Sequence, residues 1–242
     1  MSGDAARVQP VLLVVAKAPV PGRAKTRLAA AVGAVAAADI AAAALLDTLE
    51  VVREVGASSV VALTGRLEEC ARRHELEEAL SCVHVIGQRG AGLGERLANA
   101  HADAARLTRA DAVVQIGMDT PQLTADLLRG AVAGLASADA AIGPAVDGGW
   151  WCLAVRDAAL AQCLAVVPMS RADTGARTCE ALRRAGARVE RLLELSDVDT
   201  LTDAVAVAEL IPGSRFAAAV AAHAGLNAGA GASAGRRGGA SV

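Results

Sequence analysis

The residues best suited to chemistry lie in a basic loop that follows a short hydrophobic run. The run Val11–Ala16 leads into Lys17-Ala18-Pro19-Val20-Pro21-Gly22-Arg23-Ala24-Lys25-Thr26-Arg27-Leu28, which carries four cations. In open α/β proteins ligands bind beyond the carboxyl ends of the strands, where such a loop is suited to holding a polyphosphate. Lysine and arginine are also ordinary residues of solvated turns, so the loop alone leaves phosphate binding open.

This loop differs from two familiar phosphate-binding motifs. A Walker loop needs a glycine before its lysine, but Ala24 precedes Lys25-Thr26. The segment Gly90–Gly94 lacks the spacing of a dinucleotide fingerprint and follows a different predicted strand. A nucleotide site in this chain would therefore be of another type.

Three acidic positions could face the basic loop and hold a divalent cation. Asp119, in Gly117-Met118-Asp119-Thr120-Pro121, comes where a predicted strand ends. Asp147 lies in the turn-forming Asp147-Gly148-Gly149, and Asp199 precedes a predicted helix. Mg²⁺ or Mn²⁺ on carboxylates commonly neutralises the charge of phosphates. Each aspartate also has a purely structural interpretation, as a turn, a hairpin or a helix cap, so the prediction rests on their conjunction.

Apolar runs that alternate with helical patterns predict the elements that position these residues. This alternation indicates βαβ units and a mainly parallel sheet, hence the α/β class. The predicted strands are Val11–Ala16, Val60–Leu63, Val83–Ile86, Ala112–Ile116, Ala140–Gly143, Trp151–Val155 and Arg188–Leu192. The predicted helices are Leu67–Leu80, Glu95–Leu107, Ala125–Leu135, Asp157–Leu164, Thr174–Ala185 and Thr202–Leu210, besides one that precedes the second strand and stops at Gly56.

Two local patterns sharpen this prediction. The helix before Gly56 places its apolar residues on one face and the acidic residues Asp47, Glu50 and Glu54 on the opposite face. Between Gly143 and Trp151 the connection is too short for a parallel crossover, so those strands are antiparallel or the second leaves the sheet.

Composition bounds the class of protein. The chain has 242 residues, of which 54% are hydrophobic and 1% aromatic, with a formal net charge of −2. A chain of this composition can bury a core as one domain. It lacks the positive charge and the many aromatic residues of a nucleic-acid-binding protein, and only the adjacent Trp150 and Trp151 form an aromatic pair available for stacking. Five dispersed cysteines are interpreted as reduced, small core residues, and four histidines lack metal-site spacing.

The ends of the chain are predicted to lie outside the folded domain. Residues 1–10 form an N-terminal extension without a signal-peptide core, residues 11–224 the domain, and residues 225–242 a flexible Gly/Ala-rich tail. No apolar run approaches the roughly 20 residues of a membrane span, so we expect a cytoplasmic protein with no membrane or nucleic-acid partner. The oligomeric state is left open.

Four motifs in order resemble one family. They are Ala16-Lys17-Ala18-Pro19-x-Pro-Gly22-x-x-Lys25-Thr26-Arg27-Leu28, Gly117-x-Asp119-Thr120-Pro121, Gly143-Pro144-x-x-Asp147-Gly148-Gly149-Trp150-Trp151 and Val167-Pro168-Met169-Ser170. From about Val11 to Ile211 the chain resembles glycosyltransferases of the arsenosugar-biosynthesis type, within the nucleotide-diphospho-sugar transferase (GT-A) superfamily. It is more distantly similar to molybdenum-cofactor and phospholactate guanylyltransferases. The resemblance implies a single-domain Rossmann-like GT-A fold with a mixed, mainly parallel sheet flanked by helices.

The resemblance also implies roles for particular residues. Lys25, Asp119 and Asp147 would be catalytic, with Asp147 as a base for the acceptor, and Asp119 and Asp199 would hold Mg²⁺ or Mn²⁺. The implied nucleotide-binding residues are Lys17, Gly22, Arg23, Lys25, Arg27, Gln88, Gly90, Gly92 and Arg96. The implied acceptor side consists of Asp147, Gly148, Gly149, Trp150 and Ser170.

The expected function is metal-dependent transfer of a sugar from a nucleoside diphosphate to a small acceptor. One alternative is nucleotidyl transfer with release of pyrophosphate, which four cations in one loop suit somewhat better, although Ala16-Lys17-Ala18-Pro19 replaces the glycine-rich loop usual in such enzymes. Asp119 stands alone where many glycosyltransferases carry Asp-x-Asp, and Met169 stands where an aromatic residue is expected beside the acceptor. The other alternative is an inert nucleotide-binding module; the retention of Lys25, Asp119 and Asp199 ranks it last.

Overall fold

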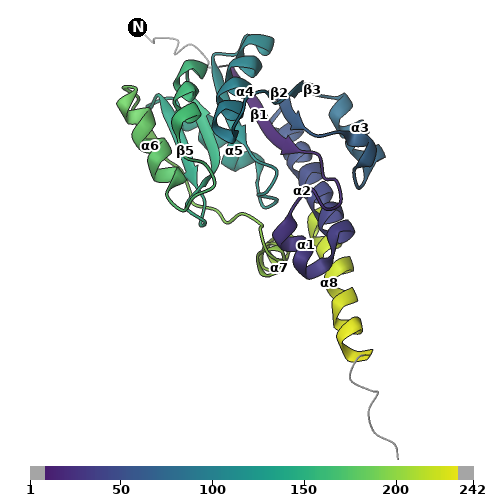
Figure 1. Ribbon diagram of the computed structural model, residues 1–242. Coiled ribbons are helices and arrows are strands. Elements are labelled where there is room, and N and C mark those ends of the chain that lie inside the picture. The colour runs from purple at the N-terminus through teal and green to yellow at the C-terminus, as the bar shows by residue number, and fades with distance from the viewer. Residues whose placement is uncertain (1–8, 234–242) are drawn as a thin grey trace, which may run out of the picture.

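A seven-stranded sheet organises the computed structural model, which describes residues 9–233 of the chain (Figure 1). The strand order is β3-β2-β1-β4-β6-β5-β7, and β6 runs antiparallel to its neighbours β4 and β5 while the other pairs are parallel. The strands are β1 (Pro10–Lys17), β2 (Ser58–Thr64), β3 (His84–Gly87), β4 (Ala112–Ile116), β5 (Ala140–Pro144), β6 (Trp150–Val155) and β7 (Val189–Arg191). The sequence prediction of an α/β fold with a mixed, mainly parallel sheet is confirmed, and the short connection before Trp151 joins antiparallel strands.

Helices cover both faces of the sheet and one of its ends (Figure 1). They are α1 (Thr26–Val32), α2 (Ala34–Val55), α3 (Arg73–Ser81), α4 (Leu93–Thr108), α5 (Ala125–Gly134), α6 (Thr174–Arg184), α7 (Leu201–Leu210) and α8 (Arg215–Ser233), with two 3₁₀ segments, η1 (Leu67–Glu69) and η2 (Ala158–Val166). Gly56 ends α2 in the left-handed conformation, as predicted.

Two predicted helices differ in the structure, and two of its helices, α1 and α8, were not predicted. The expected helix 67–80 is broken between η1 and α3, where Arg72 adopts a left-handed backbone and the Ala71 amide donates to Pro19 O at 3.1 Å. The expected helix 157–164 is a 3₁₀ segment that begins with the Asp157 carboxylate capping its first turn. Helix α1 was not predicted, because it is short and begins inside the basic loop.

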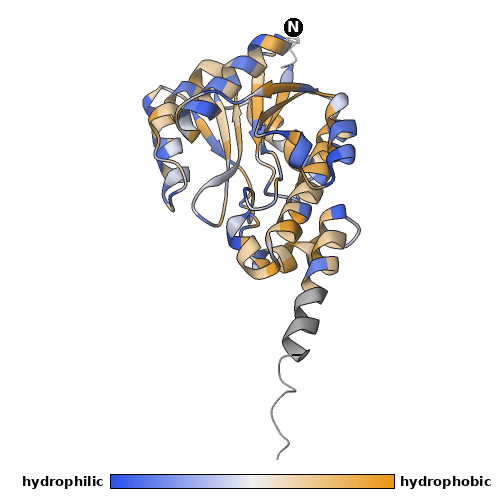
Figure 2. Cartoon of the chain, turned by 45° about the vertical axis from the view of Figure 1, so that its right-hand side comes forward, coloured by the Kyte–Doolittle hydropathy of each residue, from blue (hydrophilic) through white to orange (hydrophobic). Residues whose placement is uncertain are grey.

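The strands at the centre are buried on both faces, which is why β1 is a hydrophobic run and β4 is interrupted only by the buried Gln115 (Figure 2). Leu12 and Val14 of β1 face α2, α3 and α5. Val11 and Leu13 alternate to the opposite face, where α4, η2 and α6 pack. The apolar run thus places the end of β1, and the basic loop that follows it, at the middle of the carboxyl edge of the sheet.

A third apolar cluster joins α1, α2, α7 and α8 and corrects one prediction. Asp47 was assigned to the exposed face of its helix, but only 9% of it is exposed. Its carboxylate accepts hydrogen bonds from the Arg215 and Phe216 amides, at 3.3 and 2.8 Å, and so caps the start of α8. Helix α8 extends to Ser233 and thus into residues 225–242, which were predicted to be a tail. The last residues of that tail and the first eight residues of the N-terminal extension lie outside the described part of the chain.

Several side chains interpreted from composition alone take different places. Cys152 is a buried core residue as predicted, but Cys82 is exposed and the other three cysteines are half-buried; all five are free thiols. Trp151 is buried, with its indole N–H donating to Leu193 O at 2.9 Å, so it is not available for stacking on a ligand. Among the described residues no helix is both long and apolar enough to cross a membrane.

Candidate active site

The basic loop is fixed to the fold by its small apolar residues. Ala18, Val20 and Ala24 are buried, whereas Arg23, which lies between them, is exposed. The Ala18 amide donates to Thr64 O at 2.8 Å, which ties the start of the loop to the end of β2. The loop therefore presents charged groups from a rigid backbone rather than from a mobile turn.

Lys25 lies at the centre of the site. Its backbone is left-handed, with φ of 47°, and only 13% of its side chain is exposed. The ammonium donates to Asp119 Oδ2 at 2.8 Å and to Val198 O at 2.6 Å, and it lies 3.6 Å from Asp199 Oδ1. One cation thus bridges two aspartates that are far apart in the sequence.

The electrostatic balance keeps this ammonium charged. Burial alone would lower the pKa of Lys25, but the carboxylates around it, above all Asp119 and then Asp199, outweigh that effect and raise the pKa above its ordinary value. At the rim, Arg27 Nη1 donates to Asp199 Oδ2 at 2.8 Å from a side chain that is 77% exposed. The site is therefore a cluster of charged side chains in which the Lys25 ammonium is the central cation.

The segment around Asp199 reaches this cluster by running along the carboxyl edge of the sheet. The Leu195 amide donates to Pro144 O at 3.1 Å, and the Val198 amide donates to Asp119 O at 3.0 Å. Thr200 then begins α7 in a reciprocal capping box with Asp203. Backbone bonds to β5 and to the turn after β4 therefore hold Asp199 opposite Lys25.

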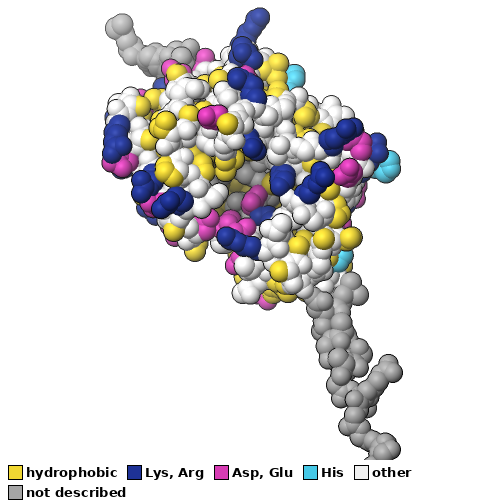
Figure 3. All heavy atoms as spheres, viewed as in Figure 1, with side chains coloured by type: hydrophobic (Ala, Val, Ile, Leu, Met, Phe, Trp, Pro, Cys, Tyr) yellow, Lys and Arg dark blue, Asp and Glu magenta, His cyan; other side chains and the backbone are white. Residues whose placement is uncertain are grey.

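A cleft of about 760 Å³ opens over these residues. The space-filling view shows a hollow with basic side chains along one side and acidic side chains along the other (Figure 3). The charged and polar residues that line it are Lys17, Arg23, Lys25, Thr26, Arg27, Thr64, Gln88, Arg96, Asp119, Asp147, Ser170, Arg171, Asp197 and Asp199. The structure thus brings together most of the residues that the sequence singled out.

One end of the cleft is formed by two interlocked turns. Asp147 Oδ1 accepts a hydrogen bond from the Gly149 amide at 2.7 Å, which fixes its carboxylate. Gly148 has φ of +87°, and a Cβ there would lie 1.9 Å from Ala172 O. The Gly175 amide donates to Gly148 O at 2.8 Å. Gly148, and Gly175 opposite it, are therefore required for the close packing of the two turns. Ser170, with φ of 57°, lines the cleft beside them.

Some predicted site residues are not among those that line the cleft. These are Gly22, Gly90, Gly92, Gly148, Gly149 and Trp150. Gly90 has φ of +140° and packs against the first turn of α4, and Gly92 is the N-cap of that helix. The glycines therefore shape the loops that carry the lining side chains.

Two charged lining residues were not assigned to the site from the sequence. Asp197 is two residues before Asp199, and this spacing in an extended chain, which puts both side chains on one side, was the available signal. Burial, and then the carboxylates of Asp147 and Asp199, raise the pKa of Asp197. Arg171, 63% exposed, follows Ser170 and had no pattern to single it out.

The donor set around Lys25 fits a divalent cation. In the described residues no group of three or more His, Cys, Asp or Glu side chains is arranged to hold a metal ion. Asp119, Asp199 and the Val198 carbonyl nevertheless already surround one cation, the Lys25 ammonium, with oxygen atoms. Mg²⁺ prefers such oxygens and typically binds through one or two carboxylates together with substrate phosphates.

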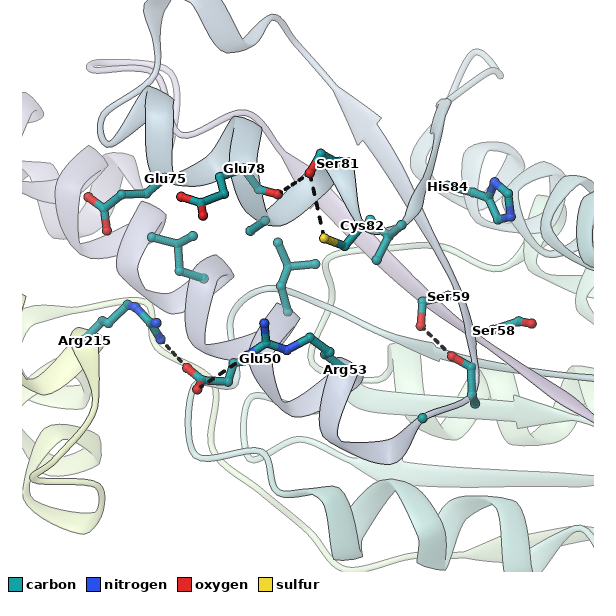
Figure 4. A pocket seen from close by; sticks show the side chains of 16 residues that line it. Glu50, Arg53, Ser58, Ser59, Glu75, Glu78, Ser81, Cys82, His84 and Arg215 are labelled. Atoms are coloured by element: carbon teal, nitrogen blue, oxygen red, sulfur yellow. Dashed lines mark hydrogen bonds and ion pairs between the residues drawn. The ribbon is translucent and has the colours of Figure 1, made fainter.

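A second cleft, of about 730 Å³, lies on the opposite edge of the sheet (Figure 4). It is lined by α2, α3 and the amino ends of β2 and β3, with Arg215 paired to Glu50 at its mouth. None of the residues predicted to act in the site lines it. In open α/β sheets ligands bind at the carboxyl ends of the strands, so the first cleft is the candidate active site.

Comparison with solved structures places this fold among nucleotide-diphospho-sugar transferases and nucleotidyltransferases. A Desulfovibrio desulfuricans G20 protein described as a "putative nucleotide-diphospho-sugar transferase" is 27% identical, with 90% of this chain and 96% of that chain covered and a TM-score of 0.79. A Leptospira borgpetersenii cytidylyltransferase is 14% identical (89% and 93% covered, TM-score 0.54). The homologue of Mycobacterium tuberculosis Rv0371c from Mycobacterium sp. strain JC1 is 20% identical (85% and 98% covered, TM-score 0.51). At these lower identities the likeness concerns the fold alone.

A match to a family model shows the family to which this chain belongs. The chain belongs to the family described as "Uncharacterized protein conserved in bacteria (DUF2064)", whose model matches residues 45–171, just over half of the chain. The matched range contains Gln88, Asp119 and Asp147, and the basic loop and Asp199 flank it. A search of curated protein sequences found no match to the chain.

Proposed function

We propose that this protein is a metal-dependent transferase that moves a sugar from a nucleoside diphosphate donor to a small acceptor. The observation that carries the proposal is the Lys25 ammonium held between Asp119 and Asp199, in a cleft that the exposed side chains of Arg23 and Arg27 also line. A diphosphate leaving group needs this kind of preorganised positive charge. The 27% identity to a protein described as a nucleotide-diphospho-sugar transferase supports the same reaction class.

The strand order arranges the proposed subsites in a row. Gln88 follows β3, Thr64 ends β2 and Lys17 ends β1, whereas Asp119 follows β4 and Asp147 follows β5. The nucleoside would lie over the first two strands, the phosphates over the basic loop, and the acceptor near Asp147. This arrangement places the bond to be broken near the Asp119 and Asp199 carboxylates.

In this mechanism different residues would bind the metal ion, bind the phosphates and accept the proton of the acceptor. Asp119, Asp199 and the Val198 carbonyl would hold Mg²⁺ or Mn²⁺, which supplies Lewis-acid stabilisation of the diphosphate when bound. Lys25 would move its ammonium from the carboxylates to the phosphate oxygens. Asp147, fixed by the Gly149 amide through Oδ1, would use its other oxygen to accept the proton of the acceptor hydroxyl.

A second candidate is nucleotidyl transfer with release of pyrophosphate. The observation that favours it is the charge of the cleft, whose lining has six Lys and Arg side chains and four Asp side chains. With a divalent cation added, that balance suits a triphosphate. The assignment to the arsenosugar-biosynthesis type remains part of the proposal.

The products distinguish the two reactions. Purified protein is incubated with Mg²⁺ or Mn²⁺, a panel of nucleotide-sugars or nucleoside triphosphates, and mixed small acceptors carrying hydroxyl or phosphate groups. Release of nucleoside diphosphate with loss of the sugar supports glycosyl transfer, and release of pyrophosphate supports nucleotidyl transfer. Asp119→Asn is expected to abolish either activity, whereas Asp126→Asn, a matched change of an exposed aspartate on α5, is expected to leave it intact. Binding of nucleotides without turnover on any acceptor would favour an inert nucleotide-binding module.

A further inference from the structure

The side chain of Gln88 is fixed by hydrogen bonds between two strands. Gln88 directly follows β3, and its backbone amide donates to Leu63 O at 3.1 Å. Its side-chain nitrogen Nε2 donates to Ala16 O of β1 and to Ala62 O of β2, each at 2.9 Å. A carboxamide has two N–H donors, so both are used by the backbone of the sheet.

These bonds determine which group Gln88 offers to a ligand. Rotating the amide by half a turn would place Oε1 against two carbonyl oxygens and lose both hydrogen bonds. The orientation is therefore set by chemistry, and the remaining polar atom is the acceptor Oε1. Because Gln88 lines the cleft and both its N–H groups are bonded to the sheet, the only amide atom that it has left for a ligand is an acceptor.

The surroundings of Gln88 suit the base of a nucleotide. Gln88 lies at the end of the cleft away from Asp147, with Lys25 and its carboxylates between them along the strand order. Leu93, 42% exposed at the start of α4, lines the same cleft and offers an apolar surface to a flat ring. The opposite end carries the carboxylates of Asp147 and Asp197, which would repel the phosphates of the donor.

We propose that Gln88 makes this site selective for nucleotides whose base carries an exocyclic amino group, and against uracil and thymine. Cytosine, adenine and guanine each present an amino group that can donate to Oε1. Uracil presents a carbonyl oxygen where cytosine has its amine, so two acceptors would face each other in the pose in which the cytosine amine donates to Oε1. Uracil would have to shift from that pose to bring its one donor, N3–H, to Oε1. The inference rests on the proposed nucleotide-binding function of the cleft.

The test begins with the unmodified protein. Isothermal titration with CDP, ADP, GDP and UDP in the presence of Mg²⁺ is expected to give UDP the weakest binding, by about tenfold or more against the best of the other three. If CDP is the best ligand, an analogue that has hydrogen in place of the 4-amino group is expected to lose most of that advantage. The corresponding analogues of ADP and GDP, without the 6-amino or 2-amino group, serve if a purine is preferred.

A variant then links the selectivity to this side chain. Gln88→Met removes the acceptor, and the ratio between UDP and the preferred nucleotide is expected to fall to within about threefold. Gln162→Met is the matched control, because Gln162 Nε2 also donates to a backbone carbonyl, Ala98 O, but does not line the cleft. If Gln88→Met fails to fold, the analogue titration on unmodified protein decides alone.

The outcomes separate this inference from the function on which it rests. Binding of UDP as tight as that of every amino-bearing nucleotide would overturn the role of Gln88 and leave the proposed function standing. Binding of no diphosphate at all, with or without Mg²⁺, would overturn both.

Discussion

Removal of the Lys25 ammonium is expected to strengthen metal binding and weaken nucleotide binding at the same time. In the structure this ammonium lies 2.8 Å from Asp119 Oδ2 and 3.6 Å from Asp199 Oδ1. At an effective dielectric constant of about 20, Coulomb's law gives gross attractions of about 6 and about 5 kcal/mol for those separations. Asp119 and Asp199 are 45% and 38% exposed, so water screens much of this attraction.

A divalent cation has to compete with the ammonium for the same oxygens. Lys25→Met removes that competitor, and we expect Mn²⁺ affinity without nucleotide to rise by about tenfold or more, which corresponds to about 1.4 kcal/mol. The same variant loses a phosphate-binding cation, so we expect nucleoside diphosphate affinity to fall by at least about tenfold. We also expect a loss of roughly 2–3 kcal/mol in the free energy of unfolding, because Asp119 loses its ion-pair partner and Asp199 keeps only the exposed Arg27.

Electron paramagnetic resonance of free Mn²⁺ measures the metal affinity directly. Lys17→Met is the matched control, because Lys17 lines the cleft and makes no ion pair with Asp119 or Asp199 in the structure. Circular dichroism establishes that each variant is folded, and Lys25→Gln serves if the methionine variant is not. Unchanged or weaker Mn²⁺ binding by folded Lys25 variants would refute the reasoning that the ammonium and the metal share one set of oxygens.

Three further predictions concern stability. Burial lowers the pKa of His101 from 6.5 to about 4, so the unfolded chain binds its proton first as the pH falls. Between pH 6.5 and pH 5 the free energy of unfolding of the native protein should fall by about 1.6 kcal/mol more than that of His101→Gln, measured by urea titration. Equal losses in the two proteins would contradict this. Gly148→Ala should lower the free energy of unfolding by roughly 2–4 kcal/mol, because the new Cβ meets Ala172 O. Gly130→Ala, which adds a Cβ in open space on α5, should not destabilise the protein. Similar melting temperatures of the two variants would be inconsistent with the interlocked turns. Thr200→Ala should cost about 1 kcal/mol through loss of the capping box, measured by thermal unfolding, and no change would argue against the cap.

The sheet and the centre of the site could be predicted from the sequence, because apolar runs mark the strands and the site lies where those strands end. Buried parallel strands are apolar runs, and the run Val11–Ala16 is recognisable without its neighbours. Because parallel strands end at the same edge, residues just after β1 and β4 meet whatever their separation in the sequence. Lys25 and Asp119 therefore meet as expected, although they are 94 positions apart.

What could not be predicted depends on packing between distant segments. Helix α8 begins in an Ala-rich stretch with no marked amphipathic pattern, and it is anchored by Asp47, whose burial cannot be seen from its own helix. Gln88 was expected near the base through resemblance, but the use of both its N–H donors by β1 and β2 requires the strand order. Arg171 enters the cleft because Gly148 and Gly175 bring two turns together.

Anomalous diffraction at the manganese edge, from crystals grown with Mn²⁺ and a nucleoside diphosphate, most directly tests whether this cleft is a metal–nucleotide site. The predicted result is one manganese peak between the carboxylates of Asp119 and Asp199, with the Lys25 ammonium moved onto the diphosphate. A nucleotide bound in the second cleft, at the amino ends of β2 and β3, or a diphosphate in the first cleft with no manganese at these aspartates, would contradict it.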